Sequence, residues 1–285
     1  MNNEIKKNIN LIDVNSNIQA RETWENKAVG SQRAAAEKGT KEYFTQIKAY
    51  RYGYETPFIP YVFNFNDLDD KTVLEIGVGN GIDAVEMIKY GAKYSGVDIT
   101  KNHIELTKKN ICYSYEERCD SLVKTIYEGD LLGIELPNKF DVVYSFGVLH
   151  HIQHENAYLL KIRELLANNG ELRIAVYAKY SFFNCWLLFT WVLRNRIKNS
   201  FSDWQSHIAE GSELGNPVVI KIRSKKEVAQ LLEKSGFEIL SYSRNGFVQG
   251  YIPVIGKYLN PRGKVLGLLA KFLGWYHCII CTPHK

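Results

Sequence analysis

The 285-residue sequence predicts an α/β protein built on a doubly wound parallel sheet. Two observations support this class. Apolar segments of strand length alternate with segments of helical periodicity from Val73 to Ser235, and the first of them runs into the glycine-rich turn from Gly77 to Gly81. Because parallel strands need a crossover connection, the alternation indicates βαβ units with right-handed crossovers.

The elements follow one another at regular spacing. We expect strands at Val73–Ile76, Tyr94–Asp98, Lys124–Glu128, Asp141–Ser145 and Glu171–Tyr177. We expect helices at Asp83–Tyr90, Asn102–Glu117, Asn156–Ala167 and Lys225–Ser235. Asn168-Asn169-Gly170 and Gly236 follow the last two helices, where residues of this kind form left-handed C-terminal stops.

The turn after the first strand is predicted to hold a ligand. Glycine permits positive φ and a close approach of ligand to backbone, and the N–H groups of the following helix point at the same place. A dinucleotide fingerprint, GxGxxG, would need glycine at position 82, where Ile82 stands. Glu75 lies two residues ahead of the first glycine, which favours a ligand with a cationic group over a pyrophosphate.

The segment Glu75-Ile-Gly77-Val-Gly79-Asn-Gly81 resembles [D/E]-x-G-x-G-x-G, the first motif of the class I S-adenosyl-L-methionine (SAM)-dependent methyltransferases. SAM carries a sulfonium, an amino group and a carboxylate. The resemblance implies SAM as the cofactor and a Rossmann-like, seven-stranded sheet with an antiparallel last strand. It assigns cofactor contacts to Glu75, Gly77, Gly79, Asn80 and Gly81.

Two further acids match the family. Asp98 ends the second strand about twenty residues after the glycines, where an acid binds the ribose hydroxyls. The alternative is a capping role, since either Asp98 or Thr100 could cap the next helix. Asp130 follows the third strand, where the family's acid bonds the adenine amino group; an ordinary turn aspartate is the alternative. Ile99 and Leu131, next to these acids, are also expected to contact the cofactor, as are Ser145 and Phe146 at the end of the fourth strand.

The segment from Asp141 to Ile152 resembles D-x-[VI]-x-[SC]-x-x-[VS]-[LF]-[HE]-H, common in the small-molecule branch of the family. DNA and RNA amino-methyltransferases place [DNS]-P-P-[YF] there, and the chain has no such tetrapeptide. His150 or His151 is a candidate general base, because imidazole titrates near neutral pH; Tyr144 is a further candidate. The alternative for both histidines is substrate orientation or packing.

The chain divides into four expected parts. Residues 1–70 form an N-terminal helical cap, in which Tyr43 and Arg51 are candidate cofactor contacts, and residues 71–178 form the SAM-binding core. An apolar insertion or lid covers residues 179–223. Residues 224–285 complete the core, with strands at Phe237–Arg244 and Trp275–Thr282 and a second insertion between them.

The most apolar run, Phe182–Leu193, is too short to span a bilayer. It is expected to be a lid or pocket wall, a core helix, or an amphipathic helix on a membrane surface. Residues 1–17 are polar and show no secretory signal. The odd number of cysteines, five, suggests reduced thiols and a cytoplasmic location.

Composition adds limits on partners. A hydrophobic content of 45% supports a sizeable core, and the net charge of +5 comes from scattered basic residues, which indicates a solvated surface rather than a nucleic-acid site. No metal is expected. Cys278 and Cys281 fall on one strand with side chains on opposite faces, and the run from His150 to His154 lacks the HExxH pattern.

These observations predict a SAM-dependent methyltransferase. Its expected acceptor is an O, N or C atom of a small or medium, partly apolar metabolite, such as a natural product, a lipid-like molecule or a short modified peptide. The alternatives are a nucleic-acid (RNA) methyltransferase, an aminopropyltransferase and a non-catalytic SAM-binding protein. The sequence identifies neither the acceptor nor the oligomeric state.

Overall fold

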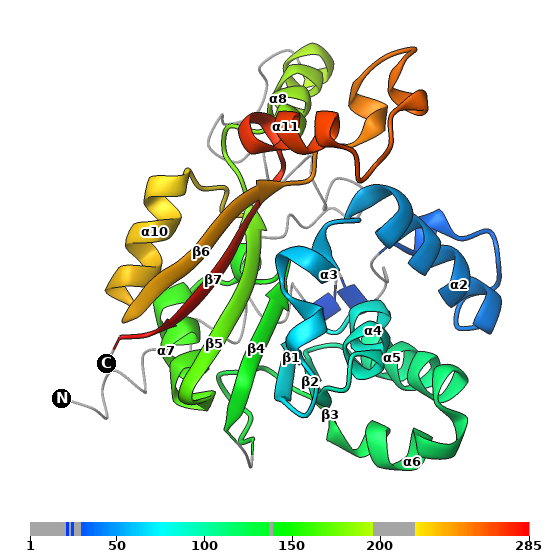
Figure 1. Ribbon diagram of the computed structural model, residues 1–285, viewed down its shortest axis with the longest axis vertical. Helices are drawn as coiled ribbons and strands as arrows, with labels where there is room; N and C mark the ends of the chain where they lie inside the picture. Colours follow the sequence, from blue (N-terminus) through cyan, green and yellow to red (C-terminus); the bar gives the residue numbers. More distant parts are fainter. Residues whose placement is uncertain (1–20, 23, 26–29, 137–138, 196–219, 285) are drawn as a thin grey trace.

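The computed structural model describes residues 21–22, 24–25, 30–136, 139–195 and 220–284. The polar segment 1–17 and the part of the predicted lid from 196 to 219 lie outside the described residues. A seven-stranded sheet with the order β3-β2-β1-β4-β5-β7-β6 forms the centre of the molecule (Figure 1). The strands are β1 (Thr72–Ile76), β2 (Lys93–Asp98), β3 (Ile126–Glu128), β4 (Phe140–Phe146), β5 (Leu166–Tyr177), β6 (Phe237–Asn245) and β7 (Tyr276–Pro283).

The predicted fold class is confirmed. Strands β1 to β5 pair in parallel, and β7 lies antiparallel between β5 and β6. Strand order reverses at β1, which has β2 on one side and β4 on the other. In an open α/β sheet a ligand binds beyond the carboxyl ends of the strands at such a reversal.

The helices of the core agree with the predicted ones to within a few residues, but one predicted C-terminal stop is wrong. They are α4 (Ile82–Lys89), α5 (Lys101–Ser114), α7 (Glu155–Leu165) and α10 (Lys225–Lys234). Gly236 follows α10 with φ of 81°, as predicted. The stop predicted at Asn168-Asn169-Gly170 is wrong, because α7 ends at Leu165 and Leu166 already pairs with Phe140 of β4.

Buried side chains cover both faces of the sheet. Cys278 belongs to the apolar cluster on one face and Cys281 to the cluster on the other, as the alternation of a strand predicts. Burial raises the pKa of the Cys278 thiol to about 12, so it stays protonated. The expectation that all five cysteines are reduced is wrong, because a disulfide joins Cys112 of α5 to Cys119 at the start of α6 (Cys119–Leu122).

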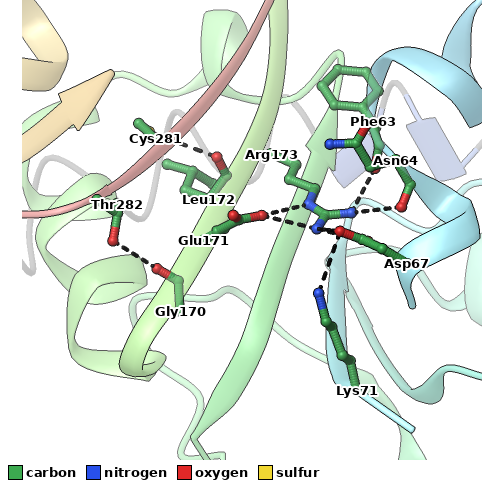
Figure 2. A network of polar contacts seen from close by, with 10 residues as sticks. All are labelled: Phe63, Asn64, Asp67, Lys71, Gly170, Glu171, Leu172, Arg173, Cys281 and Thr282. Atoms are coloured by element: carbon green, nitrogen blue, oxygen red, sulfur yellow. Dashed lines mark hydrogen bonds and ion pairs between the residues drawn. The ribbon is translucent and has the colours of Figure 1, made fainter. Parts of the chain in front are cut away.

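The N-terminal cap consists of α2 (Lys41–Tyr50), a π-helical turn at Arg51–Glu55 and α3 (Ile59–Val62). Arg173 of β5 fastens the chain that follows the cap (Figure 2). Its buried guanidinium donates hydrogen bonds to the carbonyl oxygens of Phe63 and Asn64, at 2.6 and 3.1 Å. It also pairs with the carboxylates of Asp67 and Glu171. The chain immediately after the cap is therefore held to β5 by a buried guanidinium group whose N–H groups donate to protein oxygens.

The described parts of the two insertions lie at one end of the molecule (Figure 1). Helix α8 (Phe182–Asn195) follows β5, and α11 (Lys264–Leu273) precedes β7. Tyr177, the last residue of β5, pairs with Tyr276, the first of β7, so both insertions leave the sheet at the carboxyl end of β5. The rings of Phe182 and Phe247 pack together at 5.7 Å and join them.

Candidate active site

A cavity of about 580 Å³ opens at the carboxyl ends of β1, β2 and β4, at the reversal of strand order. The cap and both insertions complete its wall. It is large enough for a cofactor of nucleoside size. The residues predicted from the sequence that line it are Arg51, Glu75, Gly77, Gly79, Asn80, Asp98, Ile99, Asp130, Leu131, Phe146 and His151.

Two glycines of the turn have different structural roles. Gly79 has φ of 55°, and a Cβ atom placed on it would meet no atom within 4 Å, so its missing side chain leaves open space in the cavity wall. Gly81 has φ of 69°, but it does not line the cavity. Its Cβ atom would lie 2.9 Å from the Cα atom of Thr107, so this glycine lets α4 approach α5.

Glu75 lies at the end of β1 with only 3% of its surface exposed. The hydroxyl group of Tyr94 donates a hydrogen bond to its carboxylate at 2.7 Å. Burial and the nearby charge of Asp83 raise the pKa of Glu75 well above its ordinary value, despite the bond from Tyr94 and the charge of Arg51. The Glu75 carboxyl group is therefore protonated more readily than that of an exposed glutamate, and a cation beside it would favour the ionised form.

Asp83, in the first turn of α4, is the centre of a buried polar network. Arg51 donates from Nε to Oδ1 at 2.8 Å and makes a second contact from Nη2 to Oδ2. The hydroxyl groups of Tyr52 and Tyr144 donate to the same carboxylate at 2.5 and 2.8 Å. Burial alone would raise the pKa of Asp83, but the Arg51 charge and the three donors lower it. This ion pair joins the cap to the core.

Asp98 turns its carboxylate toward α5 while it lines the cavity. Oδ1 accepts hydrogen bonds from the backbone N–H and the hydroxyl of Thr100, at 3.0 and 2.9 Å, and lies 3.3 Å from Nδ1 of His103. Burial would raise its pKa, but the His103 and Thr100 contacts hold it below the ordinary value. Thr100, not Asp98, is the N-cap residue, because its hydroxyl accepts from the His103 N–H. Asp98 is therefore an ionised acceptor.

Asp130 is both a turn aspartate and a residue of the cavity wall. Its Oδ1 accepts a hydrogen bond from the Leu132 N–H at 3.0 Å, the geometry of a turn aspartate. It also lines the cavity, together with Gly129 and Leu131. The local turn thus fixes the carboxylate at the cavity wall beyond the end of β3.

The three candidate catalytic residues lie in different surroundings. His151 lines the cavity, and its ring lies 5.6 Å from the ring of Trp24. His150 is fully buried, does not line the cavity and stacks on Tyr177 at 3.6 Å between ring centroids. Burial, His151 and Arg223 lower its pKa well below the ordinary value, so it is neutral. Tyr144 does not line the cavity either, and its hydroxyl is bound to Asp83.

Ser145 and Tyr43, also predicted to contact the cofactor, do not line the cavity but contact residues that do. The Ser145 hydroxyl lies 3.4 Å from the carbonyl oxygen of Ile76, and the Tyr43 hydroxyl donates to Oδ1 of Asn80 at 3.3 Å. Both Ile76 and Asn80 line the cavity. Ser145 and Tyr43 therefore hold lining residues in position.

Part of the cavity wall is aromatic and comes from the insertions; the prediction of a lid or pocket wall at Phe182–Leu193 pointed to it, but no individual side chain was named. Phe183 of α8, Tyr251 of the second insertion and Trp275 line it, and the rings of Phe183 and Trp275 lie 4.8 Å apart. Tyr177 stacks on Trp275 at 4.3 Å. Aromatic residues in both insertions were the only signal in the sequence, because strand and helix periodicity do not show which loops meet. The cavity thus has carboxylates beside the glycine turn and aromatic side chains at the insertions, and we call these two parts its polar and apolar ends.

Residues 48–242, about two thirds of the chain, match a family model described as a methyltransferase domain. The chain belongs to this family and is a class I SAM-dependent methyltransferase, with SAM as its cofactor. The solved magnesium protoporphyrin IX methyltransferase from Synechocystis PCC 6803 with bound SAM has a similar fold. Its TM-score is 0.55 and its identity 11%, over 95% of this chain and 97% of that one.

Curated relatives match less than half of this chain. The mitochondrial ubiquinone biosynthesis O-methyltransferase of Schizosaccharomyces pombe is 31% identical over 114 residues, 40% of each chain. A tRNA U34 carboxymethyltransferase of Actinobacillus succinogenes is 32% identical over 109 residues, 37% of this chain and 32% of that protein. The matches therefore span less than half of either relative, and the two relatives act on different classes of acceptor.

Proposed function

We propose that this methyltransferase transfers the methyl group of SAM to an O, N or C atom of a small or medium, partly apolar metabolite. The observation that carries the proposal is the division of the cavity into two ends. Glu75, Asp98 and Asp130 lie at the end beside the glycine turn, and aromatic side chains from both insertions line the other end. A polar cofactor and an apolar acceptor fit these two ends.

The polar end has the groups that SAM needs. Ionised Asp98 would accept hydrogen bonds from the ribose hydroxyls, and Asp130 with Leu131 would hold the adenine. Glu75 would attract the cationic amino-acid part of SAM, and Arg51 on the cap would attract its carboxylate. The open space beside Gly79 leaves room for the ligand against the backbone. SAM itself supplies an activated methyl group on a sulfonium.

The protein's contribution to the transfer is mainly positioning. An in-line displacement gains much of its rate when the nucleophile is held about 3 Å from the methyl carbon. The aromatic wall would orient the acceptor, and the cap and insertions would exclude water. His151 is the candidate base for an acceptor that keeps its proton at neutral pH, because it lines the cavity. His150 and Tyr144 would act by supporting the wall.

Calorimetry with SAM and S-adenosylhomocysteine tests the cofactor site. Wild type should bind both with micromolar dissociation constants. Asp98→Ala should weaken binding by at least about tenfold, because each charge-assisted hydrogen bond contributes about 1.5–3 kcal/mol. Asp120→Ala, on exposed α6, is the matched control and should bind like wild type. Failure of the wild type to bind SAM would exclude the assignment of this cavity.

The tRNA carboxymethyltransferase relative makes RNA a second candidate acceptor. A transfer assay with radiolabelled methyl SAM distinguishes the two. Extracts of the source cell are offered before and after ribonuclease treatment, and the label is separated by size and by extraction into organic solvent. Label in an extractable small molecule that survives ribonuclease supports the proposal, whereas label that disappears with the RNA contradicts it. SAM binding without any transfer would indicate a non-catalytic SAM-binding protein.

A further inference from the structure

Exposed apolar side chains are concentrated in the two insertions. Of fifteen large hydrophobic residues that are exposed in the described part of the chain, ten lie in α8 or between residues 254 and 273. Soluble surfaces carry such residues singly, and a concentration of them marks an interaction site. The largest exposed fractions are those of Val254 at 82%, Tyr258 at 78% and Phe272 at 69%. We call this set of residues the insertion face.

Helix α11 is apolar on both of its sides. Leu266 and Ala270 are buried against Phe247, the side that attaches the helix to the protein. Val265, Leu268 and Phe272, spaced by three and four residues, are each more than half exposed. A helix that is apolar all round is normally buried on every side, so the outer side of α11 is suited to a further apolar partner.

The charges of the insertion face have a single sign. Residues 239–284 contain no aspartate or glutamate, and neither does α8. Lys257, Lys264 and Lys271 are exposed among the apolar side chains. An apolar surface with lysines and without acids complements the interface of an anionic bilayer, where apolar groups enter the acyl boundary and lysines meet the headgroups. No helix in the described ranges is long and apolar enough to cross a bilayer.

The insertion face and the apolar end of the cavity are built by the same elements. Phe182 of α8 packs on Tyr251 at 4.9 Å, in the cluster that holds α11. Tyr251 and the neighbouring Phe183 also line the cavity. A molecule dissolved in a bilayer would therefore meet the aromatic end of the cavity, while SAM binds at the glycine turn.

We propose that the insertion face docks on an anionic lipid bilayer and that the acceptor is an apolar molecule taken from that bilayer. The docking proposal depends only on the composition of the insertion face, whereas the proposed origin of the acceptor rests on the proposed function. The two are therefore tested separately, docking by vesicle binding without SAM and the cofactor site by calorimetry without vesicles.

The docking test is flotation of the full chain with vesicles of phosphatidylcholine, with and without 30 mol% phosphatidylglycerol (about the anionic fraction that attracts basic surfaces). The wild type should float with the anionic vesicles, and less at high salt. Leu268→Ser/Phe272→Ser should weaken the partition on the order of 10- to 100-fold, from the apolar surface no longer buried. Lys264→Gln/Lys271→Gln should weaken it roughly fivefold per lysine.

The matched control is Leu160→Ser/Leu240→Ser, which removes two exposed leucines of α7 and β6. It should float like wild type, and all variants should keep the circular dichroism and SAM affinity of wild type. Wild type that stays with the unbound fraction at low salt overturns the docking proposal. A Leu268→Ser/Phe272→Ser variant that floats like wild type would also overturn it. The same holds if wild type does not bind vesicles but forms a concentration-dependent dimer that this double substitution abolishes.

The acceptor half is tested by the radiolabel assay on the membrane and the soluble fractions of the extract, each added to enzyme with vesicles present. Label entering a lipid-extractable product of the membrane fraction supports it. Label found only in the soluble fraction overturns it, even where docking is observed.

Discussion

Gly79 and Gly81, two of the three glycines in the turn after β1, should respond differently to substitution by alanine. Gly81→Ala places a non-glycine residue at φ of 69°, which costs about 1–2 kcal/mol. Its methyl group would also lie 2.9–3.1 Å from three atoms of Thr107, one of which is backbone, and overpacking of this kind costs about 1–3 kcal/mol. We therefore expect a loss of about 2–5 kcal/mol in the free energy of unfolding.

Gly79→Ala meets the same backbone penalty at φ of 55° but no steric contact within 4 Å. Its cost in unfolding free energy should be only about 1–2 kcal/mol. The new methyl group would stand in the cavity, however, where the proposed site places SAM. SAM affinity should fall at least about tenfold, equivalent to 1.4 kcal/mol of binding free energy.

Urea unfolding and SAM calorimetry on the same two proteins separate these effects. Gly81→Ala should unfold at clearly lower urea, and its remaining folded fraction should bind SAM. Gly79→Ala should unfold at a urea concentration between those of Gly81→Ala and wild type, and it should bind SAM poorly. A Gly81→Ala variant as stable as wild type would refute the packing argument, and a Gly79→Ala variant with normal SAM affinity would remove the turn from the binding site.

Further variants test the buried charges and the candidate base. Asp83→Asn should lower the unfolding free energy by about 3–5 kcal/mol in urea, because it leaves the mostly buried Arg51 side chain without its counter-charge. Asp83→Asn/Arg51→Met should recover part of the loss. The folded-state pKa of Asp83 is lowered, so its contribution is present above its unfolded pKa and lost as pH falls through the folded pKa. Wild type should therefore lose stability below about pH 4, and Asp83→Asn should show a flatter profile; parallel profiles would contradict the ion-pair assignment. Because the pKa of Glu75 is raised in the folded protein and a cation beside it would lower that pKa, SAM binding should release protons over the pH range in which free-enzyme Glu75 is partly protonated. This release would be seen as a calorimetric enthalpy that varies with buffer ionisation enthalpy, and it should be absent in Glu75→Gln. Once an acceptor is known, His151→Ala should remove the lower limb of the pH–rate profile and His150→Ala should not; identical profiles for both would exclude His151 as the base.

The sequence was most informative where a local rule governs the structure. The run from Glu75 to Gly81 has a strand end, an acid and three glycines in contiguous order, so its conformation follows from the residues themselves. The resemblance of this run to the family motif then identified the cofactor. Asp98 was found because the length of one βα unit fixes its distance from the glycines. The false stop at Asn168-Asn169-Gly170 shows the limit, because pairing of Leu166 with β4 ended α7 earlier than local preference did.

Residues that meet only through tertiary structure were beyond local rules. Asp83 looks in sequence like an ordinary acid in the first turn of a helix, and only the packing of the cap on α4 brings Arg51 and Tyr52 to it. His150 and His151 are adjacent in sequence and equal as candidate bases. The turn after β4 buries one against Tyr177 and directs the other into the cavity.

The sequence by itself determined the class of protein, its cofactor and the positions of the acids and glycines at the polar end of the site. Those features depend on short segments whose geometry is set by neighbouring residues. Only the tertiary structure decided which histidine reaches the cavity, which glycine packs and which stays open, and that the two insertions meet. These depend on contacts between segments up to about a hundred residues apart, such as Phe183 with Trp275, which no local periodicity encodes.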